Sequence, residues 1–337
     1  MQATASSAGN VCRACEEKVM SNPTHCLPPL RWRNRRACLH AAAAAVGAAL
    51  IPHRALGAGA IRFGTTPVFL NEQIGLLDRW QRHLELRLER PVRFVQRGSY
   101  REIVDLLLGD GVEAAWLCGH PLVLHESKLA VVAVPRYQGA PVYRSHLIVP
   151  ASDAATRQVL DLKGRVFAYS DPLSNSGFLV PRAEIAASGT NPASFFRRSF
   201  FTFSHRKVVD AVRAGLADGG AVDGYVWDTI AAQQPASVAG LRVAWRSAAH
   251  GFPPVVARRN WAAGEARLLG DALREMPGSP EGRGILERLN IEGFEAPRPG
   301  QYESIRALLS VADRGGSSGN LRASHSGIRR WGGPAGS

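Results

Sequence analysis

The chain has 337 residues, of which 45% are hydrophobic and 20% are charged, a composition typical of an ordinary soluble globular protein. Its length favours two domains. The net charge is +13, and of the 41 basic residues only four are lysines. Because the basic residues are scattered along the chain and form no stripe with interleaved aromatic residues, this charge does not indicate nucleic-acid binding.

The N-terminal segment has the three parts of an export signal. Arginines between residues 31 and 36 precede an alanine-rich run, Ala37–Ile51, and small residues follow it. This run is too short to cross a membrane, which takes about 20 apolar residues. Arg35 and Arg36 resemble a twin-arginine signal, and a general secretory signal is the alternative. The sequence therefore predicts an export leader over residues 1–59 and a periplasmic location.

From Ile61 onward, short apolar segments alternate with amphipathic ones, which is the pattern of an α/β protein. In the first part of the chain this alternation predicts strands at Ile61–Gly64, Pro91–Gln96 and Ala114–Cys118. Helical periodicity predicts a helix over Glu72–Glu89. The capping box Ser99–Glu102 predicts the start of a second helix, which ends at Gly109.

The middle of the chain repeats this alternation. Strands are predicted at His146–Val149, Val166–Tyr169 and Ala221–Val222. A polar loop, Asp171–Phe178, leads into a helix that ends before Gly189. Ser204 is placed to cap a further helix over His205–Ala214.

The last part of the chain begins with an extended region. It covers Arg242–Arg258 and is interrupted by one glycine and two prolines. Three helices are predicted after it, at Gly264–Glu275, Gly282–Leu289 and Tyr302–Leu309. From residue 314 to 337, glycine, serine and arginine dominate without apolar periodicity, which predicts a disordered tail.

The loop Asp171–Phe178 carries the most informative pattern. It supplies the hydroxyls of Ser174 and Ser176, the amide of Asn175 and, at Gly177, a residue that lets backbone N–H groups approach a ligand. A helix N-terminus has unsatisfied N–H donors and a partial positive charge, so the loop is suited to an anion. The alternative is a plain helix cap, but one cap requires only one such residue.

Several short motifs occur in an order that is shared with one known family. They are Ser174–Gly177, Pro181-Arg182, Phe203–His205 ahead of Val208–Val212, and Gly220–Asp223, with Asp161–Gly164 and Tyr143–Ser145 also matching. In order and spacing they resemble the phosphate, phosphite and phosphonate solute-binding proteins of ABC importers. The resemblance runs from about Ile61 to about Leu309.

This resemblance implies a type II periplasmic binding-protein fold. In that fold two α/β lobes, each a mixed sheet flanked by helices, close on a ligand. The chain would cross between the lobes twice, near Ser145–Pro150 and near Arg242–Pro254. We therefore expect lobe 1 to comprise residues 60–145 and 242–313, and lobe 2 to comprise residues 146–241.

The resemblance also implies the ligand-binding residues, which are Tyr100, Tyr143, Ser174, Asn175, Ser176, Gly177, His205 and Asp223. Hydroxyl, N–H and imidazole donors suit the three oxygens of a phosphonate. Asp223 would receive a ligand amine or a P–OH proton, and Asn175 replaces the hydroxyl common in the family, which leaves the identity of the oxyanion open. No metal or cofactor is expected. The expected partners are the ligand and the membrane permease of an ABC importer, and the chain is expected to be a monomer.

Cys118 allows a different interpretation of the site. It ends a predicted strand just before Gly119, at the edge where open α/β sheets bind ligands. It is either a small buried apolar residue or a soft ligand for arsenite. The second interpretation would make the chain a sensor that signals to a membrane histidine kinase, as a related branch of the family does.

An enzyme is the alternative of another class. Ser176, His205 and Asp223 occur in an order that a hydrolase triad could use. The serine, however, does not lie in a G-x-S-x-G nucleophile elbow, and the sequence has neither an HExxH motif nor a P-loop. We therefore expect a non-catalytic protein.

Overall fold

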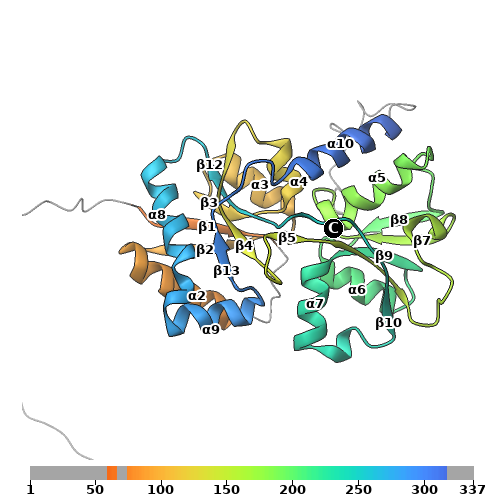
Figure 1. The fold of residues 1–337 in the computed structure, drawn as a ribbon, viewed down its shortest axis with the longest axis horizontal. Coiled ribbons are helices and arrows are strands. Elements are labelled where there is room, and N and C mark those ends of the chain that lie inside the picture. The colour runs from red at the N-terminus through yellow and green to blue at the C-terminus, as the bar shows by residue number, and fades with distance from the viewer. Residues whose placement is uncertain (1–58, 67–73, 317–337) are drawn as a thin grey trace, which may run out of the picture. The chain divides into compact units, whose positions relative to one another are not determined.

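The computed structural model describes residues 59–66 and 74–316, which all belong to one compact unit that begins at residue 57. These residues fold around two mixed β-sheets, each with helices on both faces (Figure 1). The predicted α/β class is confirmed. Residues 1–58 of the predicted leader and most of the predicted tail lie outside the described residues.

The first sheet has six strands in the order β13-β4-β12-β3-β1-β2. Strand β1 runs parallel to both β2 and β3, whereas β12 is antiparallel to β3 and β4, and β13 is antiparallel to β4. The strand bounds are β1 Ile61–Thr65, β2 Val92–Gln96, β3 Ala114–Trp116, β4 Leu129–Arg136, β12 Val255–Arg258 and β13 Gly293–Glu295.

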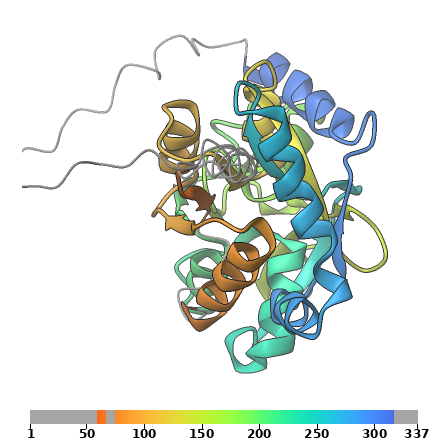
Figure 2. The same cartoon turned by 90° about the vertical axis from the view of Figure 1, so that its left-hand side faces the viewer.

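Helices cover both faces of the first sheet. On one face lie α2 (Ile74–Leu88), α8 (Ala263–Arg274) and α9 (Pro280–Leu289), and α2 packs against both of the others (Figure 2). On the other face α3 (Tyr100–Leu108) packs on β1, β3 and β12. The alternation of side chains along a strand explains this arrangement, since Trp116 joins the core under α2 while its neighbour Leu117 joins the core under α3.

The second sheet has five strands in the order β10-β6-β9-β7-β8. Strand β6 is antiparallel to β9 and β10, and β7 is parallel to β8 and β9. Helices α6 and α7 pack on one face, and η2 and α5 lie on the other. The bounds are β6 Ser145–Pro150, η2 Val159–Leu162, β7 Val166–Tyr169, α5 Val180–Ala187, β8 Arg198–Phe201, α6 His205–Arg213, β9 Gly219–Asp223, α7 Gly224–Gln233, η4 Pro235–Ser237 and β10 Leu241–Arg246.

Two segments connect the sheets and pair with each other on the way. Strand β5 (Val142–Tyr143) is antiparallel to β11 (His250–Gly251) and forms a separate two-stranded ladder with it. The last helix, α10 (Glu303–Gly316), packs against α5 and also contacts α4 (Gly119–Leu124) (Figure 1). It therefore touches helices associated with both sheets, and the exact lobe boundaries stay a prediction.

Three details differ from the sequence prediction. The sequence analysis missed β4, β5, β8, β13, α4 and α7. Helix α7 has buried residues on all sides at its start, so it lacks the polar face on which helical periodicity depends. Helix α10 continues to Gly316, beyond both its predicted end and the predicted start of the tail. The Ser204 side chain does not cap α6, and the chain enters that helix through Phe203, whose φ is +58°.

Candidate functional site

Five helical segments begin in one region between the sheets. Tyr100 is the first residue of α3, Cys118 is the N-cap of α4, and Ser174 is the N-cap of η3, a single π-helical turn over Asn175–Leu179. His205 is the first residue of α6, and Asp223 is the N-cap of α7. Each segment follows a strand, so the site lies where α/β sheets usually bind ligands. The convergence supplies partial positive charge without a formal cation.

The loop before α5 combines a cap with an unused donor. The Gly177 N–H donates to Ser174 Oγ at 2.9 Å, and the Ser145 hydroxyl donates to the Ser176 carbonyl at 2.7 Å. Ser176 is completely buried, yet within the described part of the chain its Oγ makes no hydrogen bond of good geometry. A Cβ on Gly177 would lie 1.9 Å from Ser170 Oγ, so only glycine fits there.

The hydrogen bonds of His205 identify its tautomer. The Asp223 backbone N–H donates to Nδ1 at 3.1 Å, so the proton of the neutral ring is on Nε2. Nε2 lies 3.2 Å from the Tyr100 hydroxyl, which leaves the phenol O–H free to donate elsewhere. Burial lowers the pKa of His205 to about 3. His205 is therefore a neutral donor, and a cationic role does not fit this environment.

Cys118, Tyr143 and Asn175 form a second group of contacts. The Asn175 side-chain amide donates to the Tyr143 hydroxyl at 3.0 Å, and its backbone N–H donates to Cys118 Sγ at 3.2 Å. The Tyr143 hydroxyl lies 3.9 Å from the same sulfur. Burial raises the pKa of Cys118 to about 11, so the sulfur is a neutral thiol and not a thiolate.

Two buried carboxylates border the same region. Asp223 Oδ1 accepts the Tyr225 N–H at 2.9 Å, and burial raises the pKa of this carboxyl to about 7. Asp171 accepts the Leu173 N–H at 2.8 Å through Oδ1 and the Tyr100 N–H at 3.2 Å through Oδ2. Burial also raises the pKa of Asp171. Asp171 thus joins the loop after β7 to the first turn of α3.

The structure brings all eight predicted ligand residues and Cys118 into this region, and all nine residues are buried. The sequence analysis missed Thr65, Ser170 and Asp171. Thr65 Oγ1 and Ser170 Oγ are also buried without a hydrogen-bond partner among the described residues. Their position at the ends of β1 and β7 was the available signal, because ligands bind beyond the carboxyl ends of such strands.

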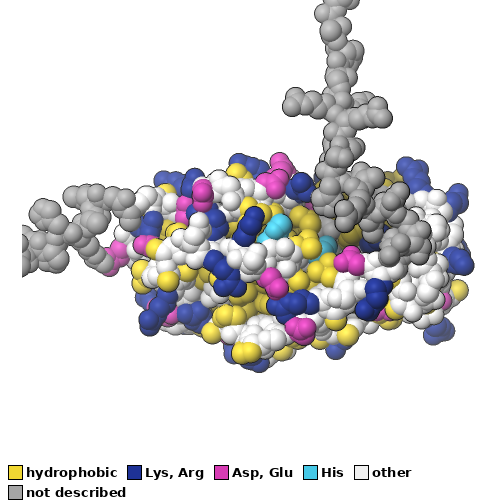
Figure 3. Space-filling view, turned by 90° about the horizontal axis from the view of Figure 1, so that it is seen from above, with side chains coloured by type: hydrophobic (Ala, Val, Ile, Leu, Met, Phe, Trp, Pro, Cys, Tyr) yellow, Lys and Arg dark blue, Asp and Glu magenta, His cyan; other side chains and the backbone are white. Residues whose placement is uncertain are grey.

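Nearby arginines do not enter this donor group. Arg101 pairs with Asp105 in the exposed part of α3, and the Arg144 guanidinium donates to the Ser247 carbonyl. On the face shown in Figure 3, basic side chains are interspersed with acidic and apolar ones and form no continuous stripe. Charge complementarity at the site therefore comes from N–H and O–H dipoles.

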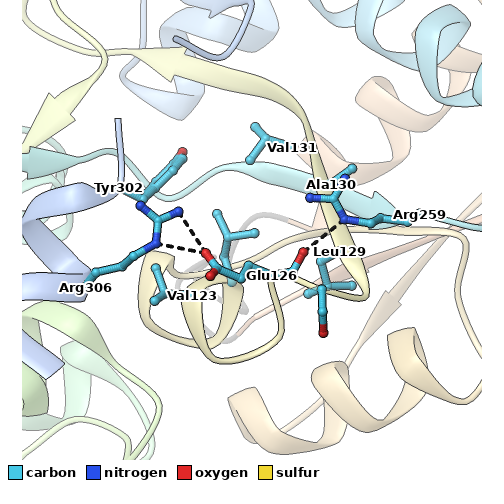
Figure 4. Close-up of a pocket in the computed structure, with 10 residues that line it drawn as sticks. Val123, Glu126, Leu129, Ala130, Val131, Arg259, Tyr302 and Arg306 are labelled. Atoms are coloured by element: carbon cyan, nitrogen blue, oxygen red, sulfur yellow. Dashed lines mark hydrogen bonds and ion pairs between the residues drawn. The ribbon is translucent and has the colours of Figure 1, made fainter. Parts of the chain in front are cut away.

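A larger hollow lies elsewhere, between α4, β4 and α10 (Figure 4). It has a volume of about 580 Å³. Its two arginines are already engaged with Glu126: Arg306 lies 2.8 Å from the carboxylate, and Arg259 donates to the backbone carbonyl at 3.0 Å. This hollow lacks the buried unpartnered hydroxyls of the site between the sheets, so we do not assign the oxyanion to it.

Two other kinds of feature are absent from the described ranges. No group of three or more His, Cys, Asp or Glu side chains is arranged to hold a metal ion there. Across the same ranges, no helix has both the length and the apolar character needed to cross a bilayer.

Comparisons with known proteins agree with this geometry. Residues 63–302 match the model of a family described as the periplasmic substrate-binding protein of the phosphonate ABC transporter. The phosphonates-binding periplasmic protein of Escherichia coli K12 is 26% identical over 271 residues, which cover 77% of this chain and 79% of that protein.

Solved structures show the same fold. A binding-protein component of an ABC phosphonate transporter from Pseudomonas aeruginosa matches with a TM-score of 0.71 and 22% identity, over 79% of this chain and 90% of that one. PhnD1 of Prochlorococcus marinus MIT 9301, solved with methylphosphonate, matches with a TM-score of 0.68 and 18% identity, over 76% and 98%. These neighbours are two-lobed periplasmic binding proteins, which confirms the predicted fold class.

Proposed function

This chain belongs to the phosphonate-binding family of periplasmic ABC transporter substrate-binding proteins, and we propose that it captures a phosphorus oxyanion between its two sheets. The candidate ligands are phosphate, phosphite and phosphonates. The observation that carries this proposal is the Ser176 hydroxyl, which lies fully buried near Tyr143 at the start of a helical turn and makes no hydrogen bond of good geometry within the described residues. A buried donor without a partner costs free energy unless a ligand satisfies it.

The surrounding donors suit an anion with several oxygens. The proposed ligand would accept hydrogen bonds from the hydroxyls of Ser176, Tyr100 and Tyr143. The single N–H of neutral His205, on Nε2, would hold the Tyr100 oxygen so that the phenol O–H can point to the ligand. Each hydrogen bond to a charged group contributes about 1.5–3 kcal/mol, and each helix N-terminus adds about 0.3–1 kcal/mol. Several such contacts account for selective binding without an arginine.

Contacts across the site support capture by closure of two lobes. Tyr100, which follows the first sheet's β2, bonds through its backbone to Asp171 and through its hydroxyl to His205, both of which follow strands of the second sheet. The Cys118–Asn175 hydrogen bond makes a third such link. A ligand that bridges the same elements would favour the closed arrangement, as in hinge-closing proteins.

The geometry argues against the hydrolase alternative. In a catalytic triad the acid carboxylate orients the histidine and the histidine bonds to the serine. Here the Asp223 backbone N–H, and not its carboxylate, bonds to His205, whose other nitrogen faces Tyr100. Ser176 makes no hydrogen bond to His205. The proposed role is therefore non-catalytic.

Family membership also favours transport over arsenite sensing. The partner implied by the family is the membrane permease of an ABC importer. Arsenite is best held by thiolates, whereas Cys118 is a neutral thiol whose pKa is raised to about 11 by burial. The proposed location is the periplasm, reached through the leader in residues 1–59.

Ligand screening tests the proposal. Native mass spectrometry of the purified protein should show a bound phosphorus oxyanion, and thermal-shift measurements should show stabilisation by phosphate, phosphite or a phosphonate but not by arsenite. At a free ligand concentration 100 times the Kd, binding stabilises the fold by about 2.7 kcal/mol. If no phosphorus oxyanion raises the Tm, the proposal is wrong.

A further inference from the structure

Helix α7 of the second sheet contacts the C-terminus of α9, a helix that packs against α2 on the first sheet. In Figure 1 the two helices lie along the lower edge of the view. This contact joins the two sheets directly, in addition to the connecting segments β5 and β11. It lies outside the group of residues proposed to hold the oxyanion.

The C-terminus of α9 needs hydrogen-bond donors. The last four carbonyls of a helix have no partner within the helix. In α9 the carbonyls of Leu286 and Glu287 accept the N–H groups of the two residues that follow the helix, at 3.1 Å and 3.0 Å. Asn290, the first of these residues, adopts the left-handed conformation that such a turn requires, with φ at +55°. The carbonyls of Arg288 and Leu289 still need donors.

Side chains of α7 supply these two donors. The Tyr225 hydroxyl donates to the Leu289 carbonyl, and the Gln233 side-chain amide donates to the Arg288 carbonyl at 3.0 Å. Tyr225 and Leu289 are both buried, and a buried carbonyl that loses its donor costs free energy. The C-terminus of α9 is therefore capped by a helix that belongs to the other sheet.

Two further hydrogen bonds extend the same contact. The Asn290 side-chain amide donates to the Thr229 hydroxyl at 2.9 Å, and the Tyr137 hydroxyl, just after β4, donates to the Asp228 carboxylate at 2.7 Å. The rings of Tyr137 and Tyr225 also pack edge to face, with their centroids 5.4 Å apart. The four side chains of α7 that make the hydrogen bonds lie on one face of the helix. They are termed the α7 latch: Tyr225, Asp228, Thr229 and Gln233.

A groove of about 410 Å³ borders the latch. Three acidic side chains line it, from Asp228, Glu287 and Glu292. Polar groups beside an open groove can exchange a protein partner for water, so each of these hydrogen bonds contributes only modestly to the net free energy. The latch can therefore open without unfolding either sheet.

The latch is closed in the same arrangement in which the proposed site is closed. The Tyr100–His205 and Cys118–Asn175 contacts cross the site while Tyr225 caps α9. A contact behind a hinge would separate as the site closes, whereas here both sets of contacts are formed together. The latch bonds join protein groups alone, so they stabilise the closed arrangement whether or not a ligand is bound.

We propose that the α7 latch holds the two sheets closed in the unliganded protein and so sets the fraction of molecules whose site is assembled before binding. The apparent affinity of such a protein falls in proportion to its closed fraction. The latch residues would thus act as positioning residues without touching the ligand, and a weaker latch would lower the affinity for every ligand by the same factor. The inference rests on the proposed function only for affinity, since closure concerns the unliganded protein.

Small-angle X-ray scattering of the unliganded protein tests closure. The fourfold variant Tyr137→Phe, Tyr225→Phe, Thr229→Val and Gln233→Ala removes the donor or acceptor of each latch bond and keeps the two rings. Loss of one hydrogen bond shifts an equilibrium by about two- to tenfold, so the four losses together should favour the open arrangement by at least about tenfold. The radius of gyration should rise above the wild-type value. An unchanged radius in the folded variant would overturn the inference.

Ser279→Ala is the matched control. Ser279 caps the other end of α9, where its hydroxyl accepts the Gly282 N–H at 3.0 Å. Loss of this cap should destabilise α9 about as much as loss of a latch bond, but it leaves the contact with α7 in place. The radius of gyration should stay at the wild-type value. A rise as large as in the fourfold variant would show that weakening of α9, and not loss of the latch, opens the protein, and would overturn the inference.

A milder variant, Gln233→Ala with Asn290→Gly, replaces the fourfold one if circular dichroism shows that the latter does not fold. Gln233 is exposed and Asn290 is half-buried, and glycine keeps the left-handed conformation at position 290. The same rise in the radius is expected in this variant, and an unchanged radius would again overturn the inference.

Calorimetry with phosphate, phosphite and methylphosphonate completes the test. For each oxyanion that binds the wild type, the affinity of the opened variant should fall by one common factor. A wild-type affinity despite a larger radius, or a loss confined to one ligand, would overturn the inference. If no phosphorus oxyanion binds the wild type, the proposed function fails, and the scattering of the unliganded protein still decides whether the latch holds the sheets closed.

Discussion

The Tyr100 hydroxyl lies 3.2 Å from Nε2 of His205, although 105 positions separate the two residues in the chain. Tyr100 begins the helix that follows β2 of the first sheet, and His205 begins the helix that follows β8 of the second. This contact therefore joins the two sheets at the proposed ligand site. Since His205 donates to the phenol oxygen, the phenol proton is available to an anion.

Loss of this contact should weaken ligand binding. Tyr100→Phe removes a donor to the anion and a link across the site, so affinity should fall about tenfold or more. His205→Ala should cost a similar amount, and His205→Gln, which restores an N–H donor, should recover part of it. Calorimetry measures all three variants, and wild-type affinity in both Tyr100→Phe and His205→Ala would contradict the assigned pocket.

Ser176→Ala tests the unpartnered hydroxyl. If Ser176 donates to a charged ligand, its removal should cost about 1.5–3 kcal/mol, or roughly ten- to hundredfold in affinity. The unliganded fold should not lose stability, because the hydroxyl has no partner within the described structure. Ser188→Ala, in an exposed position after α5, is the matched control. Equal affinities in the two variants would remove Ser176 from the site.

Asp223 should make binding depend on pH. Burial raises its pKa to about 7, so the carboxyl is protonated at pH 5 and ionised at pH 8. The ionised form repels an anion, and affinity for methylphosphonate should therefore fall as the pH rises through 7. The ligand's own ionisation also makes its affinity depend on pH. Asp223→Asn should leave that part of the dependence and remove the part that comes from the carboxyl. A profile identical to that of the wild type would contradict this role.

The same group affects the stability of the unliganded protein. The pKa of Asp223 is about 7 in the folded state and about 4 in an unfolded chain. Its contribution to the free energy of unfolding is thus fully present below about pH 4 and is lost as the pH rises through 7. The Tm of Asp223→Asn relative to the wild type should accordingly be higher at pH 8 than at pH 5.

Cys118 should be unreactive and dispensable for oxyanion binding. Its thiol is buried and its pKa is raised to about 11, so a thiol reagent at pH 7.5 should modify it only after denaturation. Cys118→Ala should change the affinity for phosphate by less than about threefold, since the thiol gives the anion no strong donor. Stabilisation by arsenite that Cys118→Ser abolishes would instead support the soft-ligand alternative.

Export should end with removal of the leader. N-terminal sequencing of periplasmic protein should find a start near residues 57–60, where small residues follow the alanine-rich run. Replacement of Arg35 and Arg36 by lysine should block export if the twin-arginine route is used, and should leave it intact if the secretory route is used. Cytosolic protein that retains the intact leader would argue against export.

The sequence alone predicted the α/β class and pointed to the loop at the centre of the proposed site. Both follow from local rules: apolar alternation marks strands, and the Ser-Asn-Ser-Gly run stands where a strand leads into a helix. The order of short motifs then identified the family. Helix α7 escaped detection because its first residues are buried on all sides and carry no amphipathic pattern.

Only the tertiary structure decided which atoms are free to bind. His205 is a neutral Nε2–H donor because the Asp223 backbone occupies its other nitrogen, and the buried Ser176 hydroxyl makes no hydrogen bond of good geometry within the described residues. Protonation and the satisfaction of donors depend on neighbours that are distant in sequence, so no local pattern encodes them.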